Sequence, residues 1–341
     1  MKPLTRKRAI TAAATAIAVI GLIIFVHESA AVGTATTAVG VAATSAATAS
    51  DAGESAGGQP VTRATQTGEV PVLVSTDWVA AHREDPGVLL VHVAMLEMAP
   101  PAAFIPGAVA LDYHAIETSE GGVAVELPPV EQLATIFRRA GIGGATHVVL
   151  YGPAPAHLAA RAFVTLEYLG HGRLSVMDGG IEAWQAEGRP TVPRPAEPAA
   201  GSFVPQVRAD IVVDADWIAA RLDDASIVPL DARPADQFSS TRGRGSLRPG
   251  HIPGAGNLYF VELLESEDMP RLKPRAEVEA LFAAAGAGAG KTVVSYCQIG
   301  MRASYNYLIA RHLGYDVKFY DGSWADWGAR SDLPVETGPR R

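Results

Sequence analysis

Short apolar segments alternate with amphipathic ones along most of this chain. The segment Thr292 to Tyr296 (TVVSY) is a compact run with β-branched residues, which is the pattern of a buried strand. Tyr305, Leu308, Ile309 and Leu313 follow at positions i, i+3, i+4 and i+8, the spacing of a helix with one apolar face. Repeated along the chain, this alternation predicts an α/β protein whose parallel sheets are covered by helices on both faces.

The N-terminus has a different pattern. Basic residues at positions 2, 6, 7 and 8 precede an uncharged apolar run from Ala9 to Val26, close to the roughly 20 residues that a bilayer-spanning helix needs. Ser29-Ala30-Ala31 matches a small-residue cleavage site, so residues 1–30 are expected to be a membrane anchor or a signal peptide. In either case the folded domains lie outside the cytoplasm, and they are periplasmic if the segment is cleaved. Residues 31–69 are rich in Ala, Thr, Ser and Gly, the composition of a flexible tether.

Residues 70–190 and 209–336 resemble each other. Four matches occur in the same order in both segments: DWVAA at 77 and DWIAA at 216, IPGA at 105 and 252, VVLY at 148 and VVSY at 293, and DGG at 178 with DGS at 321. The shared order predicts a tandem domain duplication. The proline-rich residues 191–208 between the copies predict an extended linker. Because tryptophans recur in both copies, we expect them in the cores; they are Trp78, Trp184, Trp217 and Trp327.

The two copies differ at their polar positions. The only cysteine, Cys297, follows the VVSY strand of the second copy, whereas the first copy has Gly152 there. Prolines at 153 and 155 also remove backbone donors from that loop of the first copy. His92 replaces Asp231, Ala94 replaces Arg233, and Phe104 replaces His251. We therefore expect chemistry in the second copy alone, with His251 in a structural role.

Composition and charge limit the possible partners. The chain has 341 residues, 48% of them hydrophobic, which suits two domains with substantial cores. The net charge of −8 disfavours nucleic acid and means that an anionic substrate must be captured by local arginines and backbone donors. A single cysteine excludes an internal disulfide and a thiolate metal cluster. We expect neither a metal nor an organic cofactor.

A lone cysteine is often only a small buried hydrophobe. Cys297, however, is placed between a strand and a helix, where successive backbone N–H groups and the positive end of the helix can hold an anion. Such a setting favours the thiolate, which is the nucleophilic form. Arg302 closes the same loop, and its permanent charge and planar fork suit an oxyanion. The pattern predicts a nucleophilic cysteine beside an anion site.

The combination of two α/β copies, LDAR followed by GHIPGA, a cysteine after VVSY, and YDGSWADW resembles the two-domain rhodaneses, the thiosulfate and 3-mercaptopyruvate sulfurtransferases. The resemblance covers roughly residues 70–336. It implies tandem rhodanese-like domains with an inactive first copy. It also implies that the outer sulfur of thiosulfate passes through a persulfide on Cys297 to cyanide or a thiol acceptor.

The resemblance also suggests roles for individual residues. Cys297 is the catalytic residue, and Arg302 binds the sulfonate oxygens of the donor. The other residues expected to line the substrate site are Arg233, Asp231, Gln298, Gly300 and Arg248. For Asp231 the alternative is an ion pair that only shapes the loop. Most arginines of the insertion STRGRGSLRPG, residues 240–250, are expected to be solvated.

Several alternatives stay open. The loop CQIGMR departs from the CGSGVT type of mercaptopyruvate enzymes, which favours thiosulfate, but it also lacks the basic residues that directly follow the cysteine in some thiosulfate enzymes. A cysteine phosphatase or arsenate reductase would have five residues between Cys and Arg, whereas this loop has four. A non-catalytic persulfide carrier could have the same loop. Membrane attachment is expected only through the N-terminal segment.

Overall fold

The computed structural model describes residues 70–339 apart from 120–122, 124, 244 and 246. The predicted anchor, residues 1–30, and the predicted tether, residues 31–69, lie outside the described residues. Among the residues described, no helix is long and apolar enough to cross a membrane.

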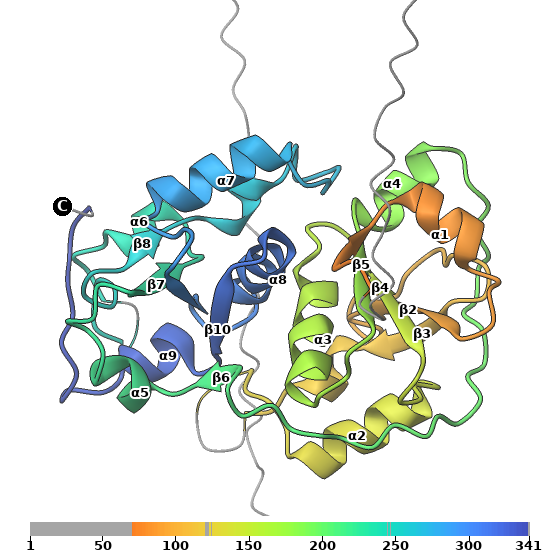
Figure 1. Cartoon of the computed structure of the whole chain (residues 1–341), viewed down its shortest axis with the longest axis horizontal. Coiled ribbons are helices and arrows are strands. Elements are labelled where there is room, and N and C mark those ends of the chain that lie inside the picture. The colour runs from red at the N-terminus through yellow and green to blue at the C-terminus, as the bar shows by residue number, and fades with distance from the viewer. Residues whose placement is uncertain (1–69, 120–122, 124, 244, 246, 340–341) are drawn as a thin grey trace, which may run out of the picture. The chain divides into compact units, whose positions relative to one another are not determined.

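The first domain is built on a parallel sheet with the strand order β1-β5-β4-β2-β3 (Figure 1). Its elements are β1 (Leu73–Val74), α1 (Thr76–His82), β2 (Val88–Ala94), β3 (Val109–Asp112), the 3-10 helix η1 (Tyr113–Ile116), α2 (Val130–Arg139), β4 (His147–Tyr151), α3 (His157–Tyr168), β5 (Leu174–Met177) and α4 (Gly180–Ala186).

The second domain repeats this topology, with a parallel sheet in the order β6-β10-β9-β7-β8. Its elements are β6 (Val212–Val213), α5 (Ala215–Ala219), β7 (Ile227–Asp231), α6 (Ala235–Phe238), β8 (Gly256–Asn257), the 3-10 helix η2 (Phe260–Leu263), α7 (Arg275–Ala284), β9 (Thr292–Tyr296), α8 (Ala303–Leu313), β10 (Asp316–Tyr320) and α9 (Ser323–Trp327). The strand over residues 292–296 and the helix after it are confirmed, as is the duplication.

Alternate residues of the central strands serve different cores. In β4, Val148 and Leu150 belong to the cluster that includes α2 and α3, whereas Val149 and Tyr151 pack with α1 and α4. This follows from the period-2 geometry of a strand, in which successive side chains point to opposite faces. Helices therefore cover both faces of each sheet, as the sequence pattern predicts.

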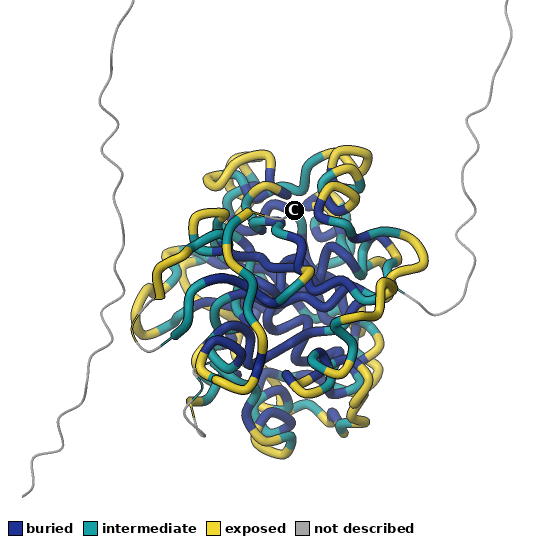
Figure 2. Tube along the Cα trace, turned by 90° about the vertical axis from the view of Figure 1, so that its left-hand side faces the viewer, coloured by how far each residue is buried: buried dark blue, intermediate teal, exposed yellow. Residues whose placement is uncertain are grey.

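One apolar cluster runs through both domains and contains α3 and α8, which lie side by side between the two sheets (Figure 1). The buried part of the trace, dark blue in Figure 2, passes through the interior of the described chain, and exposed residues are mainly in loops. Because apolar surface on each helix is removed from water by the other, the two domains form a shared core.

The segment between the domains, residues 191–208, is extended and packed on the first domain. Ala196 N donates to Ala108 O at 2.8 Å, Gly201 N donates to Arg138 O at 2.8 Å, and Phe203 is buried. These contacts tie the linker to the first domain, so it is not a free spacer.

The repeated tryptophans divide into two kinds. Trp184 and Trp327 are buried in the domain cores, as predicted. Trp78 and Trp217 are only partly buried, which corrects the expectation that all four are core residues. The ring of Trp78 stacks on His82 at 4.3 Å, and Arg221 lies 4.1 Å over the ring of Trp217, so each has one face covered by a polar side chain near the surface.

Candidate active site

Cys297 lies in the loop between β9 and α8, as the sequence predicts, and it is fully buried. Gly300 gives the loop its tight turn. Its φ is +82°, in the left-handed region that favours glycine. A Cβ at this position would lie 3.0 Å from Asp321 O and 3.1 Å from Arg161 Nη1, so a larger residue would also collide with its neighbours.

Hydrogen bonds from the segment after β10 hold the start of this loop. Cys297 N donates to Ser323 Oγ at 3.2 Å, and Cys297 O accepts from Trp324 N at 3.0 Å. Gln298 O accepts from Ala325 N at 2.9 Å. The carbonyl groups on either side of the thiol are therefore turned towards α9, which leaves the opposite side of the loop for backbone N–H groups.

These N–H groups are not used within the protein. Among the described residues, no acceptor lies within hydrogen-bond reach of the backbone N–H groups of residues 298–303. They run continuously into the N-terminus of α8, where the helix dipole favours negative charge. A loop with this many unsatisfied donors around a sulfur is suited to stabilise a thiolate, a persulfide or a bound oxyanion.

Arg302 lies at the end of the loop, where the two domains meet. Within the described part of the chain its guanidinium forms no hydrogen bond or ion pair, so its donors are available to a ligand. Burial and, secondarily, the charge of Arg302 lower the pKa of His157 to about 4, so this first-domain histidine is neutral at pH 7. Arg302 is thus an uncompensated cation at the domain boundary.

Asp231 and Arg233 form a buried ion pair beneath the loop. Arg233 Nε donates to both carboxylate oxygens of Asp231, at 3.0 and 2.9 Å, and Nη2 donates to Oδ2 at 2.6 Å and to Gly250 O at 2.8 Å. The guanidinium also lies 4.7 Å over the ring of Trp324. Asp231 is fully enclosed and acts as the partner of Arg233. This arrangement matches the alternative for Asp231, an ion pair that shapes the loop. Arg233 itself also lines the pocket described next.

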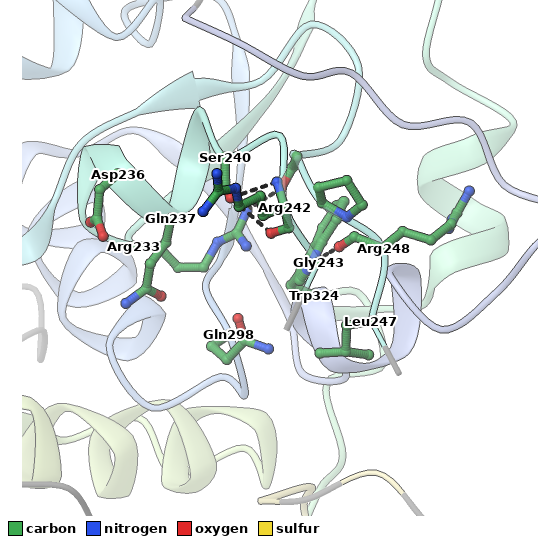
Figure 3. Close-up of a pocket in the computed structure, with 12 residues that line it drawn as sticks. Arg233, Asp236, Gln237, Ser240, Arg242, Gly243, Leu247, Arg248, Gln298 and Trp324 are labelled. Atoms are coloured by element: carbon green, nitrogen blue, oxygen red, sulfur yellow. Dashed lines mark hydrogen bonds between the residues drawn. The ribbon is translucent and has the colours of Figure 1, made fainter. Parts of the chain in front are cut away.

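A pocket of about 180 Å³ opens beside the loop (Figure 3). This volume is smaller than the roughly 300–1,000 Å³ typical of sites for drug-sized ligands, so it suits a small ion. Its lining includes Arg233, Gln237, Arg242, Gln298 and Trp324. Gln298 therefore has the position expected of a substrate-site residue. Arg242, from the insertion, is exposed yet contributes to the same wall.

Arg248 also lines this pocket, but its guanidinium is hydrogen-bonded to the C-terminal segment. Its guanidinium donates to the carbonyl oxygens of Trp327 at 3.0 Å, Gly328 at 3.3 Å and Leu333 at 2.7 Å. Figure 3 shows its side chain extending away from Gln298. These bonds fasten the C-terminal segment to the insertion and hold Arg248 in the pocket wall, so its role in substrate binding stays a prediction. His251 is structural, because its Nδ1 donates to Phe238 O at 2.9 Å and its ring stacks on Phe238 at 3.7 Å.

The equivalent place in the first domain has no such chemistry. His92 pairs with Tyr151 across the sheet as Asp231 pairs with Tyr296, so the predicted correspondence of the two copies is confirmed. His92 packs between Phe104 and Tyr151, at ring distances of 5.0 and 4.6 Å. The first-domain position that corresponds to Asp231 is therefore packed among aromatic rings instead of forming an ion pair.

The first domain also contributes to the active loop, which the sequence did not predict. Arg161 of α3 contacts the loop at Gly300, and His157 lies near Arg302. The sequence shows both residues on an apolar helix but carries no signal of what that helix packs against. Asp321 is part of a repeated motif, yet its partner across the interface is visible only in the fold. In the described residues, no cluster of His, Cys, Asp or Glu could hold a metal ion.

Comparisons with known proteins agree with this architecture. The model of the rhodanese-like domain matches residues 75–187 and 214–330. The sulfur carrier protein TtuD of Thermus thermophilus is 32% identical over 78% of this chain and 97% of its own length. The 3-mercaptopyruvate sulfurtransferase of Escherichia coli is 31% identical over 77% of this chain and 97% of its own length.

Two further comparisons cover the same region. A putative thiosulfate sulfurtransferase of Mycobacterium tuberculosis is 30% identical over 78% of this chain and 98% of its own length. The crystal structure of the 3-mercaptopyruvate enzyme SseA from Escherichia coli superimposes with a TM-score of 0.65 at 27% identity, covering 75% of this chain and 99% of SseA. The chain belongs to the rhodanese family of sulfurtransferases and contains two rhodanese-like domains.

Proposed function

We propose that this protein is a thiosulfate sulfurtransferase that carries sulfur on Cys297. The observation that carries the proposal is the loop itself. It places the only thiol of the chain among backbone N–H groups that have no acceptor in the part of the chain the structure describes, and Arg302, which has no partner there either, lies at its end. Thiosulfate is a small dianion, so it needs such donors to approach a thiolate in a protein of net charge −8.

The first half of the reaction loads the enzyme. The Cys297 thiolate attacks the outer sulfur of thiosulfate, a sulfur–sulfur bond forms, and the sulfur–sulfur bond of thiosulfate breaks. Sulfite leaves with the electron pair of that bond. The N–H groups of residues 298–303 stabilise the resulting persulfide anion, and Arg302 holds the sulfonate oxygens while the bond breaks.

The second half unloads it. Cyanide or a thiolate attacks the outer sulfur of the persulfide and takes it, as thiocyanate or as a new persulfide, which returns Cys297 to the thiolate. The chain has no second cysteine that could discharge the persulfide internally. The loaded form can therefore wait for an external acceptor.

The test is the intact mass of the protein after brief exposure to thiosulfate, with Cys297→Ser as the control. A gain of one sulfur on the wild type alone, lost when cyanide is added and thiocyanate appears, is the expected result. An unchanged mass with thiosulfate but a one-sulfur gain with 3-mercaptopyruvate would replace the donor and keep the mechanism. No gain from either donor would refute persulfide chemistry at Cys297 and return the phosphatase alternative, which hydrolysis of an aryl phosphate would reveal.

Two relatives favour specific alternatives. The Escherichia coli relative is named for 3-mercaptopyruvate, a carboxylate that Arg302 could also bind, and the Thermus relative is named as a sulfur carrier protein. Turnover distinguishes the carrier from the enzyme. A carrier loads one sulfur and then stops with small acceptors, whereas a sulfurtransferase consumes thiosulfate continuously in the presence of cyanide.

We also propose that residues 1–30 direct the protein out of the cytoplasm, with the domains held at the membrane by residues 31–69 or released after cleavage. The support is the basic flank and apolar run of the sequence. Fractionation of cells, followed by N-terminal sequencing of the mature protein, tests this. Recovery of the intact chain in the cytoplasm would contradict it.

A further inference from the structure

The interface between α3 and α8 places an arginine of the first domain beneath the active loop. Arg161 of α3 is completely buried. Its Nη1 donates to Asp321 Oδ1 at 2.6 Å, and its Nη2 donates to Val125 O at 2.8 Å. Asp321, which follows β10 of the second domain, also accepts from Leu127 N of the first domain at 2.7 Å. A charged pair therefore joins the two domains at this point.

This pair touches the catalytic loop directly. A Cβ built on Gly300 would lie 3.1 Å from Arg161 Nη1 and 3.2 Å from Asp321 Oδ1. A Cβ at this position would force the guanidinium or the carboxylate to move by a few tenths of an ångström, so glycine suits this close approach. The ring of Phe319 supports the other side, with Arg161 Cζ 5.3 Å from its centroid. The position of the guanidinium is thus determined by both domains, and the turn of the loop is built against it.

Arg161 and the Cys297 thiol also interact electrostatically. Burial is the largest single influence on the pKa of Arg161 and lowers it, but the interactions with Asp321, Tyr113 and Cys297 together outweigh burial and raise the pKa. The guanidinium therefore stays charged near the sulfur. The groups that interact electrostatically with Cys297 are Arg161 from α3, Tyr113 from η1 and Arg233 after β7, whose partner is Asp231. Asp321 after β10 lies beside Gly300, and Arg302 lies at the end of the same loop.

Comparison of the two copies shows that only α3, and not α8, has an arginine at this position. Tyr305 of α8 occupies the place that Arg161 occupies in α3, the same distance before the Leu-Gly pair that ends each helix. Tyr305 faces Asp178, the first-domain counterpart of Asp321. The helix of the first domain carries the cation, and the helix that follows the cysteine does not. At this position of the helix pair, the cation is thus supplied by the domain without a thiol.

We propose that Arg161 is a positioning residue for the sulfur chemistry of the second domain: paired with Asp321, it holds the turn at Gly300 and supplies positive charge that stabilises the anionic sulfur of Cys297. The inactive domain thereby completes the active site. This inference rests on the proposed function, because it concerns the same thiol.

The test measures the rate of iodoacetamide alkylation of Cys297 against pH, together with kcat and KM for thiosulfate. Arg161→Met removes the charge at similar length, and Arg161→Lys keeps it. We expect the pH midpoint of alkylation to rise by roughly half to one unit in Arg161→Met, since a nearby opposite charge typically shifts a titration by about one unit or more. We expect kcat/KM to fall about tenfold, mainly through kcat, and Arg161→Lys to recover most of both changes.

Asp321→Asn should shift the pH midpoint of alkylation in the opposite direction to Arg161→Met. It leaves Arg161 charged and removes the carboxylate that neutralises it, so the alkylation midpoint should fall below that of the wild type. A purely architectural pair would instead lose activity in both variants without moving the two midpoints in opposite directions. Asp321→Asn and Arg161→Lys also decide the matter if Arg161→Met does not fold.

Glu167→Gln is the matched control. Glu167 of α3 also forms an interdomain ion pair, with Arg311, whose Nε donates to Glu167 Oε1 at 2.9 Å. It is also buried, but it is about 9 Å further along the helix from Arg161. We expect a lower Tm, an unchanged alkylation midpoint and turnover within about twofold of the wild type.

The outcomes separate this inference from the proposed function. If the wild type forms the persulfide but Arg161→Met and Asp321→Asn keep the wild-type midpoint, the positioning role is refuted and the sulfurtransferase function stands. If the midpoints move as expected but thiosulfate adds no sulfur, the role of Arg161 at the thiol holds and the proposed donor is wrong. An Arg161→Met variant that behaves like Glu167→Gln in every measurement would also overturn the inference.

Discussion

Replacing His92 with leucine is expected to make the protein less sensitive to acid. His92 lies in β2 of the first domain and is 1% exposed. Among the described residues, neither of its ring nitrogens has a hydrogen-bond partner. Its neighbours are the rings of Phe104 and Tyr151. Protonation would therefore place an unpaired charge in an apolar core, which is strongly unfavourable.

The magnitude follows from linkage. Burial lowers the pKa of His92 from 6.5 to about 4. Above pH 6.5 the ring is neutral in both the folded and the unfolded chain, so folding is not opposed. Between pH 6.5 and 4 only the unfolded chain takes up the proton, and the free energy of unfolding decreases as the pH falls. The free energy of unfolding falls by about 3 kcal/mol once the pH is below 4, and about 2 kcal/mol of this decrease is reached at pH 5.

Urea unfolding followed by tryptophan fluorescence, at pH 7.5 and pH 5.0, measures this effect. The difference in unfolding free energy between His92→Leu and the wild type should change in favour of the variant by about 2 kcal/mol from the higher to the lower pH. At pH 7.5 the variant should be at least as stable, because leucine is close in volume and leaves no polar atom unpaired.

His114→Gln serves as the control, because His114 is at the surface and its pair with Glu117 is a surface interaction of the kind that contributes less than about 1 kcal/mol. An equal difference between His92→Leu and the wild type at both pH values would falsify the reasoning. It would mean that His92 titrates alike in the folded and unfolded chain, and hence that its ring is not an unpaired group in a closed core.

Three further changes test the site. Arg302→Gln should raise KM for thiosulfate about 10- to 100-fold in steady-state assays, because charge-assisted hydrogen bonds to an anion contribute about 1.5–3 kcal/mol; an unchanged KM would remove Arg302 from the donor site. Arg248→Met should lower the free energy of urea unfolding by about 3 kcal/mol through loss of three bonds to carbonyls, with KM unchanged; a raised KM would make it a substrate residue. Gly300→Ala should reduce kcat at least tenfold, since a left-handed φ costs alanine about 1–2 kcal/mol and its Cβ meets Arg161; wild-type kcat would show that the turn tolerates displacement.

Much of the architecture was predictable because it is encoded locally. The strand at 292–296 and the helix after it follow from residue spacing, and the duplication follows from short matches in a constant order. Comparison of the two copies likewise shows that the first has Gly152 where the second has Cys297. The partly buried Trp78 and Trp217 were the exception, because repetition in sequence indicates equivalent positions and not how fully each position is covered.

The sequence by itself determined which loop holds the nucleophile, since a strand, a lone cysteine and a helix N-terminus are neighbours along the chain. Only the tertiary structure decided which other groups face that sulfur. It directs Arg248 to three carbonyls, encloses Asp231 with Arg233, and brings Arg161 to Gly300 across the interface. Arg161 and Cys297 are far apart in the chain, and their proximity depends on how α3 packs on α8. That packing follows from the apolar surface the two helices bury together, which no local pattern specifies.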